Sequence, residues 1–209
     1  MRNLFFGFIF CLFLISNLAN AQVSSGQIFI GGDFSLSATT FEGNSNQNAT
    51  SFSLVPNVGF MLSDRFALGL GLGYRQAQVS TPTGVNTINT ITNGTFQVAP
   101  FLRYYVPTSS EQFAFFAQFR AELGFGSTRN EQLNTTTNVR TSTSAGLTTA
   151  DIFISPNFAF FPTPHWAIEL GVRGIGVSIT DPEGNNNTTT TFELGLNSFA
   201  PRIGLQYFF

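Results

Sequence analysis

Apolar side chains alternate with small or polar ones along most of the chain. Segment 66–75 reads FALGLGLGYR, with a large apolar or aromatic residue at every second position and Ala, Gly or Arg between them. Segment 113–126, FAFFAQFRAELGFG, has the same period of two, which is typical of a β-strand with one apolar face. Similar segments lie at 28–37, 52–62, 96–105, 151–161, 166–173 and 200–209. The pattern predicts an all-β chain of eight strands.

The connections between these segments alternate in length. Short ones, SDR, PTSSEQ and PTPH, follow the second, fourth and sixth strands. Long ones, rich in Thr, Asn and Ser, follow the first, third, fifth and seventh strands at 40–50, 80–93, 127–146 and 180–190. Sequential strands joined in this way predict an antiparallel up-and-down arrangement. The long segments have a low-complexity polar composition, so we expect them to be mobile loops.

Each even-numbered strand carries a proline at a matching place: Pro56, Pro100, Pro156 and Pro201. The repeating unit is therefore a hairpin. Because proline cannot donate a ladder hydrogen bond and is usually confined to edges or bulges, a β-bulge is expected at each proline.

The first residues have the layout of a cleaved secretory signal. Arg2 precedes the apolar run LFFGFIFCLFLI, and the small residues Ala19 and Ala21 stand just before Gln22. This run is shorter than the roughly 20 apolar residues that a membrane anchor needs. We therefore predict a signal peptide at 1–21 and a single barrel domain at 22–209. Cys11, the only cysteine, lies within the signal, so the mature chain has no thiol.

Only 10% of the residues are charged, and 26 are Phe. Soluble proteins usually carry about 25% charged residues. The net charge of -2 offers no clustered basic surface for nucleic acid. A chain of this composition is expected to place its apolar surface somewhere other than in water.

The two faces of the strands indicate which side meets lipid. The apolar faces carry no charge, and the opposite faces hold Asp33, Arg75, Arg103, Arg120, Glu122, Asp151, Glu169, Arg173 and Arg202. These charges are too sparse to solvate an exterior, but their signs nearly balance, so they can pair inside a narrow lumen. Gly69, Gly71 and Gly73 share this face, as a tight interior requires. The pattern predicts a membrane barrel with lipid outside and a lumen charge network inside.

Aromatic residues mark both ends of the predicted strands. Near the short connections or the last residue stand Phe66, Tyr104, Phe113, Trp166 and Phe209, and near the long connections stand Tyr74, Phe96 and Phe125. Two such girdles are typical of the two interfaces of a bilayer.

With these features the chain resembles the small eight-stranded outer-membrane barrels of the OmpA and OmpX type. The resemblance implies an outer-membrane protein of the Gram-negative envelope, with short periplasmic turns and long extracellular loops. It also implies that the terminal pattern of Ile203, Leu205, Tyr207 and Phe209 is an assembly signal read by the barrel-assembly machinery.

Catalytic chemistry finds little support in the sequence. The only histidine, His165, lies in the short connection PTPH, on the predicted periplasmic side. Enzymes of similar architecture act on lipid A near the outer leaflet, so His165 lies at the wrong end of the barrel for this chemistry. We expect no catalytic residue, no cofactor and no metal site.

The favoured function is a structural, adhesion or surface-interaction role, with membrane lipid and a host or matrix ligand of the long loops as partners. A small passive pore and, less favoured, a lipid-active enzyme stay open as alternatives.

The predicted lumen is filled rather than open. By parity, large side chains point inward together with the charges: Phe29, Phe101, Tyr105, Phe116, Phe153 and Phe161. An eight-stranded barrel has an interior only just wide enough for side chains. We therefore expect no continuous aqueous channel.

Overall fold

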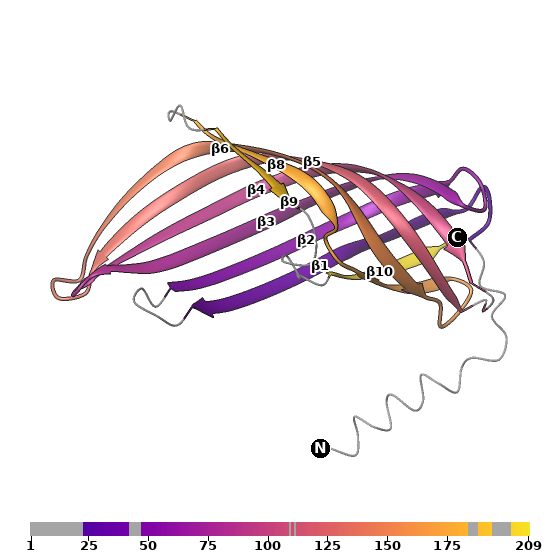
Figure 1. Ribbon diagram of the computed structural model, residues 1–209, viewed down its shortest axis with the longest axis horizontal. Helices are drawn as coiled ribbons and strands as arrows, with labels where there is room; N and C mark the ends of the chain where they lie inside the picture. The colour runs from indigo at the N-terminus through magenta and orange to yellow at the C-terminus, as the bar shows by residue number, and fades with distance from the viewer. Residues whose placement is uncertain (1–22, 42–46, 109, 111, 184–187, 194–201) are drawn as a thin grey trace, which may run out of the picture.

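The computed structural model describes residues 23–41, 47–108, 110, 112–183, 188–193 and 202–209 (Figure 1). The predicted signal peptide lies outside the described residues. The strands are β1 (Ile28–Phe41), β2 (Gln47–Met61), β3 (Phe66–Gly84), β4 (Thr87–Pro107), β5 (Phe113–Asn134), β6 (Val139–Phe160), β7 (Trp166–Gly171), β8 (Ile175–Pro182), β9 (Thr189–Glu193) and β10 (Arg202–Phe208). No helix in this part of the chain is long and apolar enough to span a membrane.

The strands close into a ring. Hydrogen-bonded neighbours follow the order β5-β4-β3-β2-β1-β10-β7-β6, and a further pairing of β5 with β6 completes a ring of eight. β7 pairs with residues 157–160 of β6, and β8 pairs with residues 147–154 of the same strand. β7 and β8 therefore act as two consecutive parts of one strand of the barrel. β9 pairs with β8. All pairings are antiparallel. The predicted eight-stranded up-and-down barrel is confirmed.

Two segments that were expected to be mobile loops are strands. Residues 80–93 and 127–146 extend the barrel wall as two long hairpins, which form the arched sheet at the left of Figure 1. β3 and β4 stay paired up to the turn Val85–Asn86, and β5 and β6 stay paired up to the turn 135–138. Asn138 in the second turn has a φ of 54°, a left-handed conformation that asparagine tolerates better than most residues.

The loop prediction failed because it relied on composition alone. The segments are rich in Thr and contain Ile and Val, and these β-branched side chains favour strands. Hydrogen bonds to the adjacent strands pair the backbone N–H and C=O groups of these segments, so the segments form strands without a packed core. In the other two long connections, residues 40–41, 47–50, 180–182 and 189–190 are also strand, and residues 42–46 and 184–187 lie outside the described part.

The prolines interrupt the hydrogen-bond ladder, mostly without shifting it. Across Pro56 and Pro100 the paired strands advance by equal numbers of residues, so the expected bulges there are wrong. The missing N–H removes a bond and leaves the register unchanged. Opposite Pro156 the neighbouring wall gains one residue between β7 and β8, which is a bulge. Pro201 lies outside the described residues.

The outer surface of the ring is apolar and the inner surface is packed. Outward side chains such as Leu68 and Ile154 are 45% and 52% exposed. At the short-turn end, Phe66 packs on Tyr104 with 4.9 Å between ring centroids. Inside this end lies the aromatic plug, a buried cluster made of Phe29, Met61, Ala67, Phe101, Tyr105, Ala114, Phe116, Ala159, Phe161, Ala167 and Phe208.

Candidate functional site

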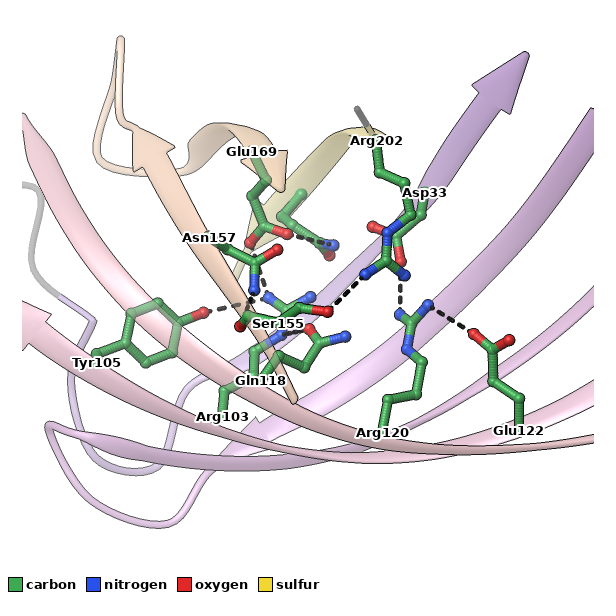
Figure 2. Close-up of polar contacts among 11 residues, drawn as sticks. Asp33, Arg103, Tyr105, Gln118, Arg120, Glu122, Ser155, Asn157, Glu169 and Arg202 are labelled. Atoms are coloured by element: carbon green, nitrogen blue, oxygen red, sulfur yellow. Dashed lines mark hydrogen bonds and ion pairs between the residues drawn. The ribbon is translucent and has the colours of Figure 1, made fainter. Parts of the chain in front are cut away.

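The part of the lumen charge network nearest the aromatic plug is the pair of Arg103 on β4 and Glu169 on β7 (Figure 2). Arg103 Nη1 lies 2.7 Å from Glu169 Oε1, and the two side chains are 0% and 5% exposed. Arg103 also donates hydrogen bonds to Gln118 Oε1 at 2.8 Å and to the Tyr105 hydroxyl at 3.2 Å. Gln206 donates to Glu169 at 3.3 Å. Alternation along β4 aims Arg103 inward beside Phe101 and Tyr105, and the pairing of β6 with β7 brings Glu169 into reach.

The same guanidinium group lies against the aromatic plug. Its central carbon is 4.8 Å from the ring centroids of both Phe101 and Phe116, and 5.1 Å from that of Phe29. Cation–π contacts of this kind are stronger where water is excluded. Arg103 therefore joins the plug to the polar layer above it.

The next layer contains Arg120 on β5 between two carboxylates. Its Nη2 lies 2.5 Å from Asp33 Oδ2, and its Nη1 lies 3.4 Å from Glu122 Oε1. Figure 2 shows these contacts one level farther along the barrel than Arg103. Arg120 is 1% exposed, so water screens this cluster only weakly.

The layer nearest the hairpin end is built on Asp151. Arg173 Nη2 approaches one of its oxygens at 3.3 Å, and Arg75 Nη1 approaches the other at 3.9 Å. Arg173 Nε also lies 2.9 Å from Glu193 Oε2. Glu193 is not among the predicted network members, because the composition of the segment 180–190 before it predicts a loop.

Arg202 differs from the other predicted network residues. Its Nη2 donates to Ser155 Oγ at 2.9 Å, and its guanidinium lies over the Phe153 ring at 5.1 Å (Figure 2). Among the described residues, no carboxylate lies within 4.0 Å of it. The structure thus brings eight of the nine predicted charges into ion pairs and leaves Arg202 on a hydroxyl and a ring.

A cavity of about 410 Å³ occupies the lumen above these pairs. Its charged lining residues are Asp33, Arg75, Arg120, Glu122, Arg173, Glu193 and Arg202. Among the described residues, no three His, Cys, Asp or Glu side chains are grouped to hold a metal ion. The lumen residues therefore provide ion pairs and a cavity with a charged lining.

The predicted assembly residues lie together on the outer face of β10. Ile203, Leu205 and Phe209 are 55%, 50% and 63% exposed. Tyr207 packs edge-on against Trp166, with 5.0 Å between ring centroids. His165, in the neighbouring turn, has its Nδ1 2.9 Å from the carbonyl oxygen of Phe208, so its contact is with the backbone of the closing strand.

An apolar outer belt, aromatic rims and a charged, packed interior define a transmembrane β-barrel. The sequence matches the family model described as outer membrane protein beta-barrel domain over residues 8–198. The chain belongs to this family, and its compartment is the outer membrane. As the resemblance to the OmpA and OmpX type implies, we expect its short turns to face the periplasm and its long hairpins to face the exterior.

Three solved structures align with the chain at low sequence identity. Ail of Yersinia pestis is 13% identical, with 88% of this chain and 99% of Ail covered at a TM-score of 0.40. OprG of Pseudomonas aeruginosa is 13% identical, with coverages of 92% and 99% and a TM-score of 0.40. The N-terminal β-barrel domain of Pseudomonas aeruginosa OprF is 9% identical, with coverages of 88% and 98% and a TM-score of 0.38. No curated protein matches the chain in sequence.

Proposed function

We propose that this chain is a non-enzymatic outer-membrane protein that presents a rigid β-sheet at the cell surface for structural or adhesive contacts. The supporting observation is that β3, β4, β5 and β6 stay hydrogen-bonded far beyond the outer aromatic rim. A continuous sheet loses less conformational entropy on binding than mobile loops do. Its Thr, Asn and Gln side chains offer hydrogen-bond donors and acceptors to a host or matrix ligand.

Shortening the two hairpins tests this proposal. Residues 79–91 are replaced by a two-residue Asn-Gly turn, and so are residues 130–143; this turn suits a hairpin at both paired positions. The two deletions are combined in one variant. We expect cells that display this variant to lose most of their attachment to surfaces coated with collagen, laminin or fibronectin, while the amount of the protein at the cell surface stays normal. The control is a variant with the Val85–Asn86 turn replaced by Asn-Gly, which keeps the sheet. Unchanged attachment in the deletion variant would contradict an adhesive role.

We also propose that the outer face of β10 is read by the barrel-assembly machinery. The side chain of Phe209 is largely exposed, and its described contact is an edge-on packing on Tyr207 at 4.9 Å. Its backbone N–H donates to the Ile28 carbonyl at 2.9 Å, a bond that any residue can make. The side chain therefore adds little to the stability of the closed barrel.

Phe209→Asp is expected to reduce the amount of assembled protein in the outer membrane severalfold and to leave the refolded barrel close to the parent in stability. Cell fractionation measures the first quantity, and urea unfolding in vesicles measures the second. Phe96→Asp, at an exposed aromatic position of the opposite rim, is the matched control. Normal membrane levels of the Phe209 variant would refute the assembly role.

A further inference from the structure

The outward face of the barrel changes its chemistry beyond the aromatic rim at the hairpin end. On β5, the alternation that places Phe119, Leu123 and Phe125 toward lipid next places Arg129 and Glu131 on that face. On β6, the residue paired with Leu133 of this face is Arg140. Arg129 and Arg140 are 57% and 64% exposed. They are thus basic side chains on the outside of the wall, in contrast to the buried lumen arginines.

Glu131 holds the two guanidinium groups close together. Its Oε1 lies 2.7 Å from Arg140 Nη1, and its Oε2 lies 3.3 Å from Arg129 Nη2. The carboxylate is 22% exposed, much less than either arginine. One negative charge therefore fixes two positive ones, and the group keeps a net positive charge with spare N–H donors.

This group lines a hollow on the same outward face. The hollow has a volume of about 490 Å³, and its polar wall is formed by Asn48, Gln78, Ser80, Thr90 and Thr92. A second hollow of about 220 Å³ shares Gln78 and is lined by Leu36 and Phe52. Leu36 is 69% exposed on the lipid-facing side of β1. The outer wall thus carries an apolar end, a middle of amides and hydroxyls, and a cationic end.

The position of the cationic end relative to the membrane follows from the strand geometry. Arg129 stands four residues beyond the rim residue Phe125. Four residues span about 13 Å along a strand, or about 9 Å along the membrane normal at a tilt of about 45°. Long arginine side chains also reach back toward the interface. The backbone of Arg140 lies farther out, opposite Leu133, but its guanidinium reaches back to Glu131. The two positive charges therefore lie at, or just beyond, the level of the outer-leaflet headgroups.

We propose that the outward groove of β1–β6, with Arg129 and Arg140 at one end and Leu36 and Phe52 at the other, binds a phosphorylated lipid of the outer leaflet. The arginines hold the headgroup phosphate through paired N–H···O bonds, for which the planar guanidinium is suited. The amides and hydroxyls contact the polar head, and the apolar end lies along the first part of an acyl chain. A lipid fits both ends of the groove, whereas a free anion fits only one.

The test measures equilibrium binding of fluorescently labelled lipid A to the refolded full-length mature protein in uncharged detergent micelles. The probes are bisphosphorylated lipid A and the same lipid with its phosphates removed. We expect the phosphorylated form to bind about tenfold or more tightly, because charge-assisted contacts to two arginines are lost without phosphate. The double variant Arg129→Gln/Arg140→Gln should abolish this preference. Arg65→Gln, in a periplasmic turn, should keep it.

Glu131→Gln gives a prediction of the opposite sign. It removes the competing carboxylate, so binding of the phosphorylated lipid should strengthen by severalfold. A preference that survives in the Arg129/Arg140 double variant, or a Glu131→Gln variant with weaker binding, would overturn the proposal. Displacement of the lipid by an equal concentration of inorganic phosphate would show a free-anion site and overturn it as well. If the double variant does not fold, Arg129→Lys/Arg140→Lys replaces it, and the loss of paired donors should still reduce the preference.

Discussion

Glu169→Ala is expected to destabilise the barrel by about 3–5 kcal/mol, because it leaves the Arg103 guanidinium buried without its carboxylate. Arg103 is 0% exposed, and its remaining partners are the neutral Gln118 and Tyr105. The aromatic plug around it cannot replace the lost charge. The measurement is reversible urea unfolding of the protein in lipid vesicles, followed by tryptophan fluorescence of Trp166.

An exposed pair of equal length provides the control. Arg140 and Glu131 also have an N–O distance of 2.7 Å, but their side chains are 64% and 22% exposed. Exposed ion pairs contribute about 0–1 kcal/mol, so Glu131→Ala should shift unfolding only slightly. Glu122→Ala should fall between the two variants, because Arg120 keeps Asp33 as its partner. Similar losses for Glu169→Ala and Glu131→Ala would show that burial does not set the strength of these pairs.

The barrel wall could be predicted from the sequence because one rule acts at every strand position. A period of two places alternate residues on opposite faces of a strand, and the confinement of charge to one face shows that Leu68 lies outside and Arg103 inside, without any knowledge of the neighbouring strand. Residues 127–146 were predicted wrongly because their composition resembles that of a loop, and only pairing between β5 and β6 makes them a strand. Such pairing depends on register, which alternation alone does not determine.

The network members could also be predicted, but their partners could not. The inner position of Glu169 follows from the pattern of β7, whereas its contact with Arg103 depends on how β4 and β7 face each other across the lumen. Arg202 shows the same limit, since its sequence context gave no sign that it would lie on Ser155 and Phe153. The role of the lumen charges in stability stays a prediction until the variants are measured.

The lumen geometry bears directly on the alternative function as a pore. The cavity of about 410 Å³ lies in the hairpin half of the lumen and contains Arg120 and Arg202 in its lining. Toward the periplasm the route meets the Arg103–Glu169 pair and then the aromatic plug, in which Phe29 is 0% exposed and Phe101 is 4% exposed. Eight strands leave an interior that side chains of this size fill. An ion would therefore have to displace both a buried ion pair and closely packed, tilted aromatic rings.

We accordingly expect the purified protein to show no stable conductance steps in planar bilayers under conditions where a general porin does. Breaking the inner pair costs about 3–5 kcal/mol, and removing a buried aromatic ring costs a similar amount, so openings of the native barrel should be rare and brief. Swelling assays with vesicles that contain the protein should likewise give no uptake of small sugars. Reproducible single-channel steps of constant size would contradict the filled lumen and would favour the pore over a purely surface-acting barrel, because the ion pairs would then line a path instead of closing it.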